Sequence, residues 1–350
     1  MICKLPSHIL TSVVNTKPFT IVRGLRRSRI RDCKMATTST TTTTTLPSMR
    51  KVGILGGTHG NELSGVYLVK QWLKNKAAVT RKNFETTVCL SNPRAVEKCV
   101  RYIDTDLNRV FTEDNLRSSQ EDSNNMYEIN RGRELHAIFG PKHSDAAYDF
   151  LVDLHNTTSN MQNSLMIHNT QDPFVVQLVR YIVDKLKHLE SNYVFITGNA
   201  YQTTRTVAKH GLGIEIGPQS HGSLIADVYQ KMETITLHTL DFIEKFNEGE
   251  VFNACTIEAY DIIDKIDFPR DKDGEICAMI HPAFQFKDWT PLKPGDNIFV
   301  TFKGETISYQ GDKTVYPAFI NEASYYEKGI AFWVMKKVEL SAPTLQMKRD

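Results

Sequence analysis

The sequence predicts an α/β fold, in which a sheet flanked by helices is followed by a smaller C-terminal β domain. Three observations predict it. Apolar runs typical of buried strands alternate with helical patterns as far as Gly249. Polar residues follow several of these runs, at the carboxyl ends where open α/β sheets place their sites. After Gly249, short strands and turn signals such as Asp273-Gly274 and Pro294-Gly295 replace the helical patterns.

The composition is that of an ordinary soluble globular protein, with 41% hydrophobic and 23% charged residues, and 350 residues leave room for two domains. The first 34 residues hold eight Lys or Arg against one acid, Asp32, so the rest of the chain is mildly acidic and no nucleic-acid-binding stripe is predicted. No apolar run approaches the roughly 18 residues that a membrane span needs. The six cysteines lack C-x-x-C spacing, which favours free thiols over a disulfide scaffold or a thiolate metal site.

Residues 1–47 run from a basic stretch into a series of threonines, and we expect a disordered or targeting extension. The protein is then expected in the cytoplasm. Residues 1–34 are also Arg-rich, Ser-containing and poor in acids, which is the composition of a mitochondrial transit peptide. A third interpretation is an untranslated leader, with Met35 or Met49 as the working initiator.

The first functional motif follows a β-branched apolar run, residues 52–55, that ends in two glycines. A polar turn then presents His59 and, three residues later, Glu62. A turn brings positions i and i+3 to the same side, so both side chains can reach one zinc ion. Taken alone, the pattern is more often a surface His beside a solvated Glu.

The next elements indicate a parallel βαβ arrangement. Leu63, Val66, Val69 and Leu73 recur at the spacing of a helix that faces the core. A second strand over residues 86–90 is broken by Asn-Pro before a short helix. Such spacing implies a parallel sheet.

A polar, irregular segment follows at residues 101–109 and contains Arg101, Asn108 and Arg109. A solvated loop with salt bridges is the simpler interpretation. Its place after a strand and a short helix favours a functional loop that lies beside the first motif. A helix is then predicted over residues 128–139, ending at Gly-Pro.

A buried strand over residues 148–155 ends in His155. Asp153 is two residues earlier and therefore projects to the same side of the strand. A carboxylate beside a ligating imidazole is a common way to orient it. With His59 and Glu62, His155 completes a His-Glu-His set, which leaves the fourth coordination position that a catalytic zinc needs.

Glu215 lies between two isoleucines on a short predicted strand that ends at Gly217-Pro218. Burial there would raise its pKa toward neutrality, as general acid–base catalysis needs. The alternative is a Glu on the wet side of an edge strand. A long helix over residues 226–246 closes a catalytic domain of residues 48–249, and residues 250–350 are expected to form a β domain that caps the site.

Together these motifs resemble the aspartoacylase family, zinc acylases with a carboxypeptidase-like fold, over residues 50 to about 345. The match is carried in chain order by Gly56-Gly57-Thr58-His59-Gly60-Asn61-Glu62, Asp104-Thr105-Asp106-Leu107-Asn108-Arg109, Asp153-Leu154-His155-Asn156-Thr157-Thr158, Gly213-Ile214-Glu215-Ile216-Gly217-Pro218 and Asn321-Glu322-Ala323-Ser324-Tyr325-Tyr326.

The resemblance implies a mixed sheet, one zinc per chain and hydrolysis of small N-acyl amino acids. It implies that His59, Glu62 and His155 hold the zinc, that Glu215 is the general base and that Arg101 faces the scissile carbonyl. The residues implied to bind the amino-acid part are Asn108, Arg109, Tyr201, Arg205 and Tyr325.

Two branches of the family compete, one cleaving N-acetyl-aspartate and one, the aminoacylase-three branch, preferring N-acyl aromatic amino acids and mercapturates. Arg205 favours the first branch, because a buried arginine without a carboxylate would be left unpaired. Residues 211–213 and 327–332 read more like the second. A non-catalytic zinc-pocket binding protein is a third possibility, against which Glu215 argues, since a pocket that only binds needs no proton shuttle. The sequence leaves a monomer and a homo-oligomer both open.

Overall fold

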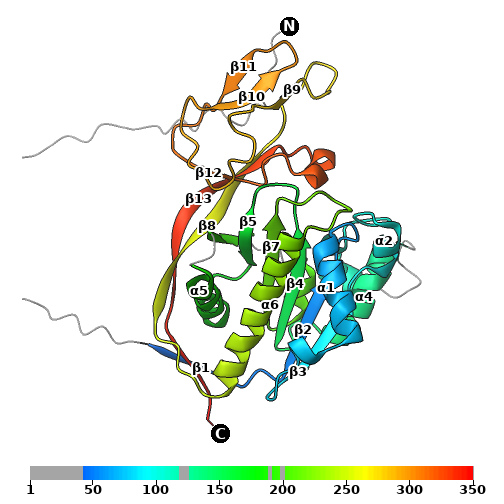
Figure 1. Cartoon of the computed structure of the whole chain (residues 1–350), viewed down its shortest axis with the longest axis vertical. Helices are drawn as coiled ribbons and strands as arrows, with labels where there is room; N and C mark the ends of the chain where they lie inside the picture. Colours follow the sequence, from blue (N-terminus) through cyan, green and yellow to red (C-terminus); the bar gives the residue numbers. More distant parts are fainter. Residues whose placement is uncertain (1–41, 118–125, 188–190, 198–201, 350) are drawn as a thin grey trace, which may run out of the picture.

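The computed structural model describes residues 42–117, 126–187, 191–197 and 202–349. In that part of the chain a nine-stranded mixed sheet forms the centre, with helices on both faces (Figure 1). From edge to edge, its strands are β12 (Tyr316–Ala318), β13 (Phe332–Ala342), β8 (Cys255–Ile266), β6 (Asn192–Ile196), β5 (Gln162–Ile167), β7 (His210–Gly217), β4 (Phe150–Asn156), β2 (Lys51–Gly56) and β3 (Glu85–Leu90). The predicted α/β class is confirmed.

The helices divide between the two faces. One face packs against α1 (Leu63–Lys74), α5 (Pro173–Leu186) and α6 (Ala226–Asn247) around the largest apolar cluster. The opposite face packs against α4 (Tyr127–Phe139) and the short 3₁₀ turns η3 (Leu107–Arg109) and η4 (Thr204–Val207). Shorter helices lie in the connections: η2 (Ala77–Val79), α2 (Pro93–Lys98), α3 (Glu113–Arg117) and η5 (Ala323–Lys328).

Helix α1 faces the core as predicted, but with a different set of residues. Val66 and Val69 are buried, whereas Leu73 is 49% exposed. Leu68 and Trp72 take the inward positions instead. With about 3.6 residues per turn, adjacent helix residues point in different directions, so Leu73 faces outward when Trp72 faces the core. On α6 the predicted inner face, with Thr239 as its polar interruption, is buried throughout.

The chain after residue 250 does not form a wholly separate body. Strands β8 and β13 pair antiparallel along their length and join the large sheet next to β6. Strands β9 (Ala278–Ile280), β10 (Asn297–Thr301) and β11 (Thr306–Ser308) form a distinct three-stranded sheet, at the upper end in Figure 1. The predicted boundary between residues 249 and 250 therefore divides one continuous sheet between β6 and β8. Turn signals in a sequence do not tell which sheet a strand joins.

Part of the predicted disordered extension is ordered. Strand β1 (Thr43–Leu46) pairs in parallel with β14 (Thr344–Met347), so the expectation of disorder is wrong for these residues. Threonine is β-branched and suits a strand. The low-complexity pattern could not reveal that β14 offers an edge for this strand to pair with. Residues 1–41 lie outside the described part of the chain.

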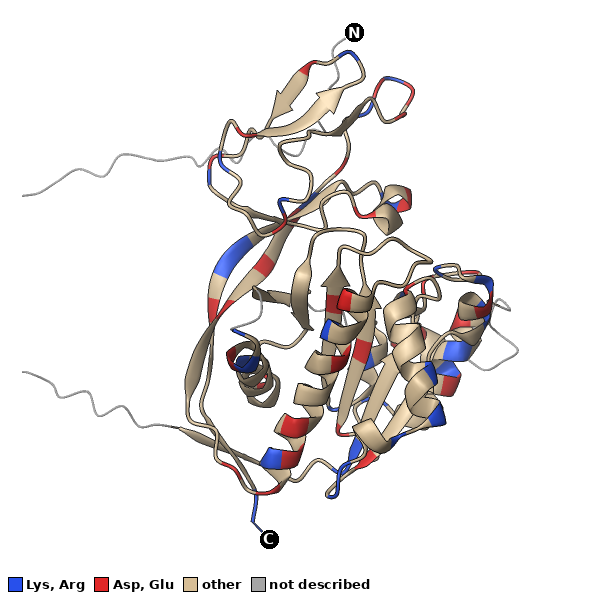
Figure 2. Cartoon of the chain, in the orientation of Figure 1, with Lys and Arg blue, Asp and Glu red and all other residues tan. Residues whose placement is uncertain are grey.

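Charged residues of both signs are interspersed along α4 and α6 (Figure 2). Among the described residues, no helix is both long enough and apolar enough to cross a membrane.

Candidate active site

Strands β4 and β7 direct their functional side chains to one face of the sheet. Side chains alternate along a strand. Leu154 and Ile214 belong to the large cluster under α1, α5 and α6, so Asp153, His155 and Glu215 point to the opposite face. His155 and Glu215 are paired neighbours on adjacent central strands. The alternative of an edge strand for Glu215 is therefore excluded.

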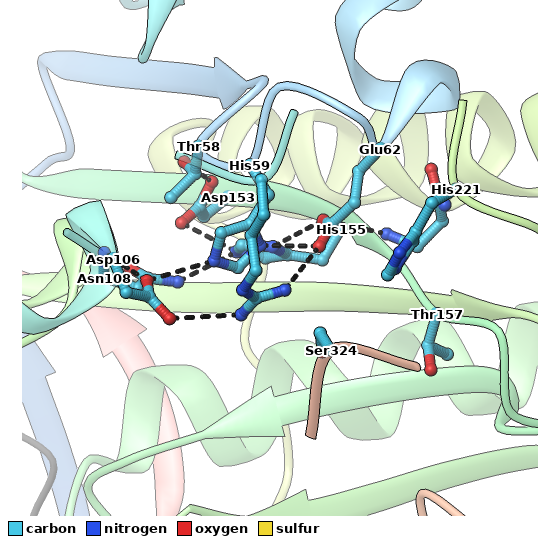
Figure 3. A network of polar contacts seen from close by, with 12 residues as sticks. Thr58, His59, Glu62, Asp106, Asn108, Asp153, His155, Thr157, His221 and Ser324 are labelled. Atoms are coloured by element: carbon cyan, nitrogen blue, oxygen red, sulfur yellow. Dashed lines mark hydrogen bonds and ion pairs between the residues drawn. The ribbon is translucent and has the colours of Figure 1, made fainter. Parts of the chain in front are cut away.

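The turn between β2 and α1 brings His59 and Glu62 to the same place. His59 Nδ1 lies 2.5 Å from Glu62 Oε1, and His155 Nδ1 lies 2.9 Å from Glu62 Oε2 (Figure 3). The three residues are at most 4% exposed, and their candidate ligand atoms all lie within 4.8 Å of one another. Two imidazole nitrogens and a carboxylate are ligands that zinc accepts, so this donor set fits the ion that the family resemblance implies.

Two glycines allow the turn to form. Gly57 has a positive φ of 70°, which favours a residue without a Cβ. At Gly60 a Cβ would lie 2.0 Å from the carbonyl carbon of Ala95. The close approach of the turn to α2 therefore requires glycine at this position.

Each imidazole is held from behind by a carboxylate. His59 Nε2 lies 3.2 Å from Asp106 Oδ1, and His155 Nε2 lies 2.9 Å from Asp153 Oδ2. Asp153 also accepts hydrogen bonds from the hydroxyls of Thr58 and Thr204. Carboxylates at Nε2 fix the ring orientation and leave Nδ1 of both rings facing Glu62.

Glu62 and Glu215 have pKa values that are shifted in opposite directions. Burial raises the pKa of Glu62, but the neighbouring His59 and His155 lower it more, and the net pKa lies well below its usual range. Burial, followed by the charge of Glu62, raises the pKa of Glu215 well above its usual value. A pair of acids with separated pKa values is typical of sites that divide metal binding and proton transfer between them.

Arg101 lies next to this cluster. Its Nη1 is 3.4 Å from Glu62 Oε1, and its Nη2 is 3.2 Å from Asp106 Oδ2. The guanidinium therefore borders the His59-Glu62-His155 cluster and is fixed by two acids.

The cluster opens into a cavity of about 290 Å³. Of the residues implied to bind the amino-acid part, Tyr201 lies outside the described residues, and the structure brings the other four to this cavity. Its lining includes Asn108, Arg109, Arg205 and Tyr325 together with His59, Glu62, Arg101, His155 and Glu215.

Arg205 is the most deeply buried of these side chains, with 2% of its surface exposed. Nη2 donates to Thr197 Oγ1 at 3.2 Å, and Nε has no partner among the described residues. Burial lowers its pKa to about 10. Within the described part of the chain, no carboxylate forms an ion pair with this guanidinium.

Glycines on β7 make room for Arg205. A Cβ at Gly211 would lie 2.7 Å from the Arg205 carbonyl oxygen, and one at Gly213 would lie 3.2 Å from Nη1. These glycines belong to the segment that read like the aromatic-specific branch, and here they accommodate the arginine.

Asn108 is held between two neighbours. Its Oδ1 accepts from the Thr204 backbone N–H at 3.1 Å, which directs Nδ2 toward His155 Nε2 at 3.2 Å. When His155 Nε2 carries a proton and donates it to Asp153, it cannot accept from Asn108. The Asn108 Nδ2 hydrogens then remain for a ligand in the cavity.

Sequence reasoning assigned no role to two buried acids of the site. Asp106 supports both His59 and Arg101, and it stands in the polar segment that was singled out. Glu322 accepts from the Thr157 and Thr158 hydroxyls, and its Oε1 lies 3.4 Å from His221 Nε2. Burial raises the pKa of Glu322, but its hydrogen bonds lower it more, to a net value of about 2. Both acids lie within family motifs, Asp106 in residues 104–109 and Glu322 in residues 321–326, and this position was the sequence signal that could have identified them.

Comparison with known proteins agrees with this geometry. Residues 48–243 match the succinylglutamate desuccinylase/aspartoacylase catalytic domain, and residues 255–337 match the barrel-sandwich hybrid domain of the same family. The chain is 48% identical to the aspartoacylase of Rattus norvegicus over 85% of its own length and 96% of that protein's. It is 44% identical to the human N-acyl-aromatic-L-amino acid amidohydrolase (carboxylate-forming), over 85% and 93% of the two chains.

Among solved structures, the chain is similar to murine aminoacylase 3, with a TM-score of 0.83 and 38% identity over 86% of this chain and all of that one. The chain therefore belongs to the succinylglutamate desuccinylase/aspartoacylase family of amidohydrolases, the family that its motifs resemble.

Proposed function

We propose that this enzyme is a zinc-dependent amidohydrolase that cleaves N-acetyl-aspartate to acetate and aspartate. The observation that carries the choice of substrate is Arg205, a buried cation in the cavity that forms no ion pair with an acidic side chain among the described residues. Burying an unpaired charge is costly, so a ligand that brings a carboxylate is strongly favoured there. Aspartate is an amino acid with such a side chain.

His59, Glu62 and His155 would hold the zinc. When bound, zinc acts as a Lewis acid that polarises a carbonyl and makes water more acidic. Glu215 accepts the proton of the attacking water and returns it to the leaving nitrogen, a role that its raised pKa suits. Arg101 places a fixed positive charge beside the carbonyl oxygen, where negative charge develops.

The two ends of the amino-acid part meet different arginines. Arg205, which is deeply buried, would take the side-chain carboxylate. Arg109, which is more exposed, would take the α-carboxylate, with Asn108 and Tyr325 beside it. Guanidinium groups suit this task because their planar donors match a carboxylate.

A second candidate rests on the apolar residues of the cavity lining. Phe319, Tyr325, Trp333 and Met166 also line it, and the Tyr325 and Trp333 rings stack with an interplanar angle of 4°. An aromatic side chain could pack there, as the name of the human relative suggests for that protein.

Parallel assays of the zinc-loaded full chain with N-acetyl-aspartate and N-acetyl-tyrosine test the proposal. We expect hydrolysis of N-acetyl-aspartate to be at least about tenfold faster in kcat/KM, with Glu215→Gln as the inactive control. Faster cleavage of N-acetyl-tyrosine would favour the second candidate. Zinc binding without hydrolysis of either substrate would support a non-catalytic binding protein.

A further inference from the structure

Helix α4 carries a carboxylate that takes no part in the proposed chemistry but is buried next to it. Glu128, in the first turn of α4, has no exposed surface. No ion pair to it occurs within the described part of the chain. A buried acid without a cation needs hydrogen-bond donors, and their identity shows what the acid holds.

All of its observed donors come from the loops beside the metal-binding cluster. Oε1 accepts from the backbone N–H of Ile103 at 2.7 Å and from Asn92 Nδ2 at 3.2 Å. Oε2 accepts from the backbone N–H of Asp104 at 2.9 Å and of Thr105 at 3.2 Å. Four acceptor sites are what an ionised carboxylate offers, so this arrangement uses its full capacity.

The hydrogen bonds from residues 103–105 to Glu128, called the clamp below, are matched by a contact in the opposite direction. Asp104 Oδ2 accepts from the Tyr127 backbone N–H at 2.7 Å and so caps the first turn of α4, which lacks a cap from its own N-cap residue. The loop therefore caps the helix while the helix holds the loop. Asn92, the other donor, caps α2 through Ala95 and so joins the end of β3 to the same point.

The segment held by this clamp carries two groups of the active site. Arg101 precedes the three bound N–H groups by two residues, and Asp106 follows them directly. Asp106 in turn contacts His59 and Arg101. The Arg101 carbonyl also accepts from the backbone N–H of Gly60, in the turn that bears His59.

We infer that Glu128 is a positioning residue for the proposed hydrolysis: it fixes residues 101–106 so that Arg101 and Asp106 meet the metal-binding cluster. The inference rests on the proposed function, because its effect is exerted through Arg101. Displacement of a catalytic group by about 1 Å can cost on the order of 100-fold in rate. Removal of a clamp some distance from the substrate therefore has a large predicted effect.

Glu128→Gln is the test variant, since an amide keeps the size of the side chain but cannot accept all four hydrogen bonds. We expect kcat for N-acetyl-aspartate to fall roughly 10-fold to 100-fold, with zinc content unchanged. Glu134→Gln is the matched control, because Glu134 lies on the same helix with its side chain 62% exposed. Glu128→Asp keeps the negative charge on a shorter side chain. Its kcat should fall less than that of Glu128→Gln, and it supplies a second folded variant.

A double-mutant cycle separates positioning from a general loss of structure. In an Arg101→Ala background one of the two positioned groups is already gone and only Asp106 still depends on Glu128, so Glu128→Gln should cost less than in the wild type, about threefold or below. An equal fall in both backgrounds would overturn the inference. Hydrogen exchange at the amides of Ile103, Asp104 and Thr105 should also accelerate in Glu128→Gln but not in Glu134→Gln.

The exchange measurement does not depend on activity. If the wild type hydrolyses neither substrate, the proposed function fails, and the catalytic role of Glu128 fails with it. If the wild type is active while Glu128→Gln keeps its full kcat and its slow amide exchange, this inference alone is refuted.

Discussion

Replacement of Arg205 by leucine tests the substrate assignment, because this side chain is the buried cation of the cavity. Arg205 is 2% exposed and donates one hydrogen bond to a described residue, to Thr197, out of the five N–H groups of a guanidinium. A bound side-chain carboxylate would supply the missing acceptors. The Arg205→Leu variant would leave that carboxylate buried against an apolar group.

The expected loss follows from this burial. Truncating one partner of a buried, hydrogen-bonded charge pair costs on the order of 2 to 5 kcal/mol. At about 1.4 kcal/mol per factor of ten, kcat/KM for N-acetyl-aspartate should fall roughly 30-fold to 3,000-fold. N-acetyl-tyrosine has no second carboxylate, so its hydrolysis should stay level or rise.

Initial rates of acetate release from both substrates, measured on the same zinc-loaded preparations, give the ratio. Lys209→Leu is a suitable control, since Lys209 is a nearby cation outside the cavity that pairs with Asp149 at 2.9 Å. It should change neither rate by more than about twofold, as expected for an exposed pair. Equal losses on both substrates in Arg205→Leu would refute the reasoning and assign Arg205 to the shared α-carboxylate or to structure.

Three further predictions follow from other groups. Glu215→Gln should keep zinc and substrate binding, while kcat falls roughly 100-fold to 10,000-fold. A fall of less than about tenfold would show that another group is the general base. Burial raises the pKa of Asp288 to about 7, above the value of about 4 in an unfolded chain, so this group makes the folded state less stable as pH rises between those values. Relative to the wild type, Asp288→Asn should therefore gain on the order of 1 to 3 kcal/mol in unfolding free energy between pH 5 and pH 8 in urea titrations, whereas the exposed control Asp273→Asn should show no such trend. We propose a cytoplasmic protein, so a fluorescent protein fused after residues 1–47 should stay in the cytoplasm, and import into mitochondria would favour a transit peptide.

Much of the site could be predicted because its residues stand at the ends of strands. His155 and Glu215 close apolar runs whose alternation sets their direction, and His59 and Glu62 follow a glycine turn. Local pattern decides each of these features. The resemblance to the family then supplied Arg101 and Arg205, which no local pattern distinguishes from surface arginines.

Other features depend on contacts between distant segments and could not be read from local pattern. Asp106 becomes a site residue only because His59 and Arg101 reach it. Glu128 reads as a solvated helix residue until the loop of residues 103–105 folds over it. Trp72 rather than Leu73 faces the core at the end of α1, and Thr43–Leu46 is a strand because the C-terminal strand β14 offers an edge.

Zinc titration of chelator-stripped protein, with zinc content and hydrolysis of N-acetyl-aspartate followed together, tests the central claim most directly. If His59, Glu62 and His155 form the metal centre of an amidohydrolase, activity should rise linearly and stop rising at one zinc per chain. His155→Ala should then neither retain zinc nor recover activity. Full activity in the metal-free protein, or full zinc occupancy in His155→Ala, would contradict the account.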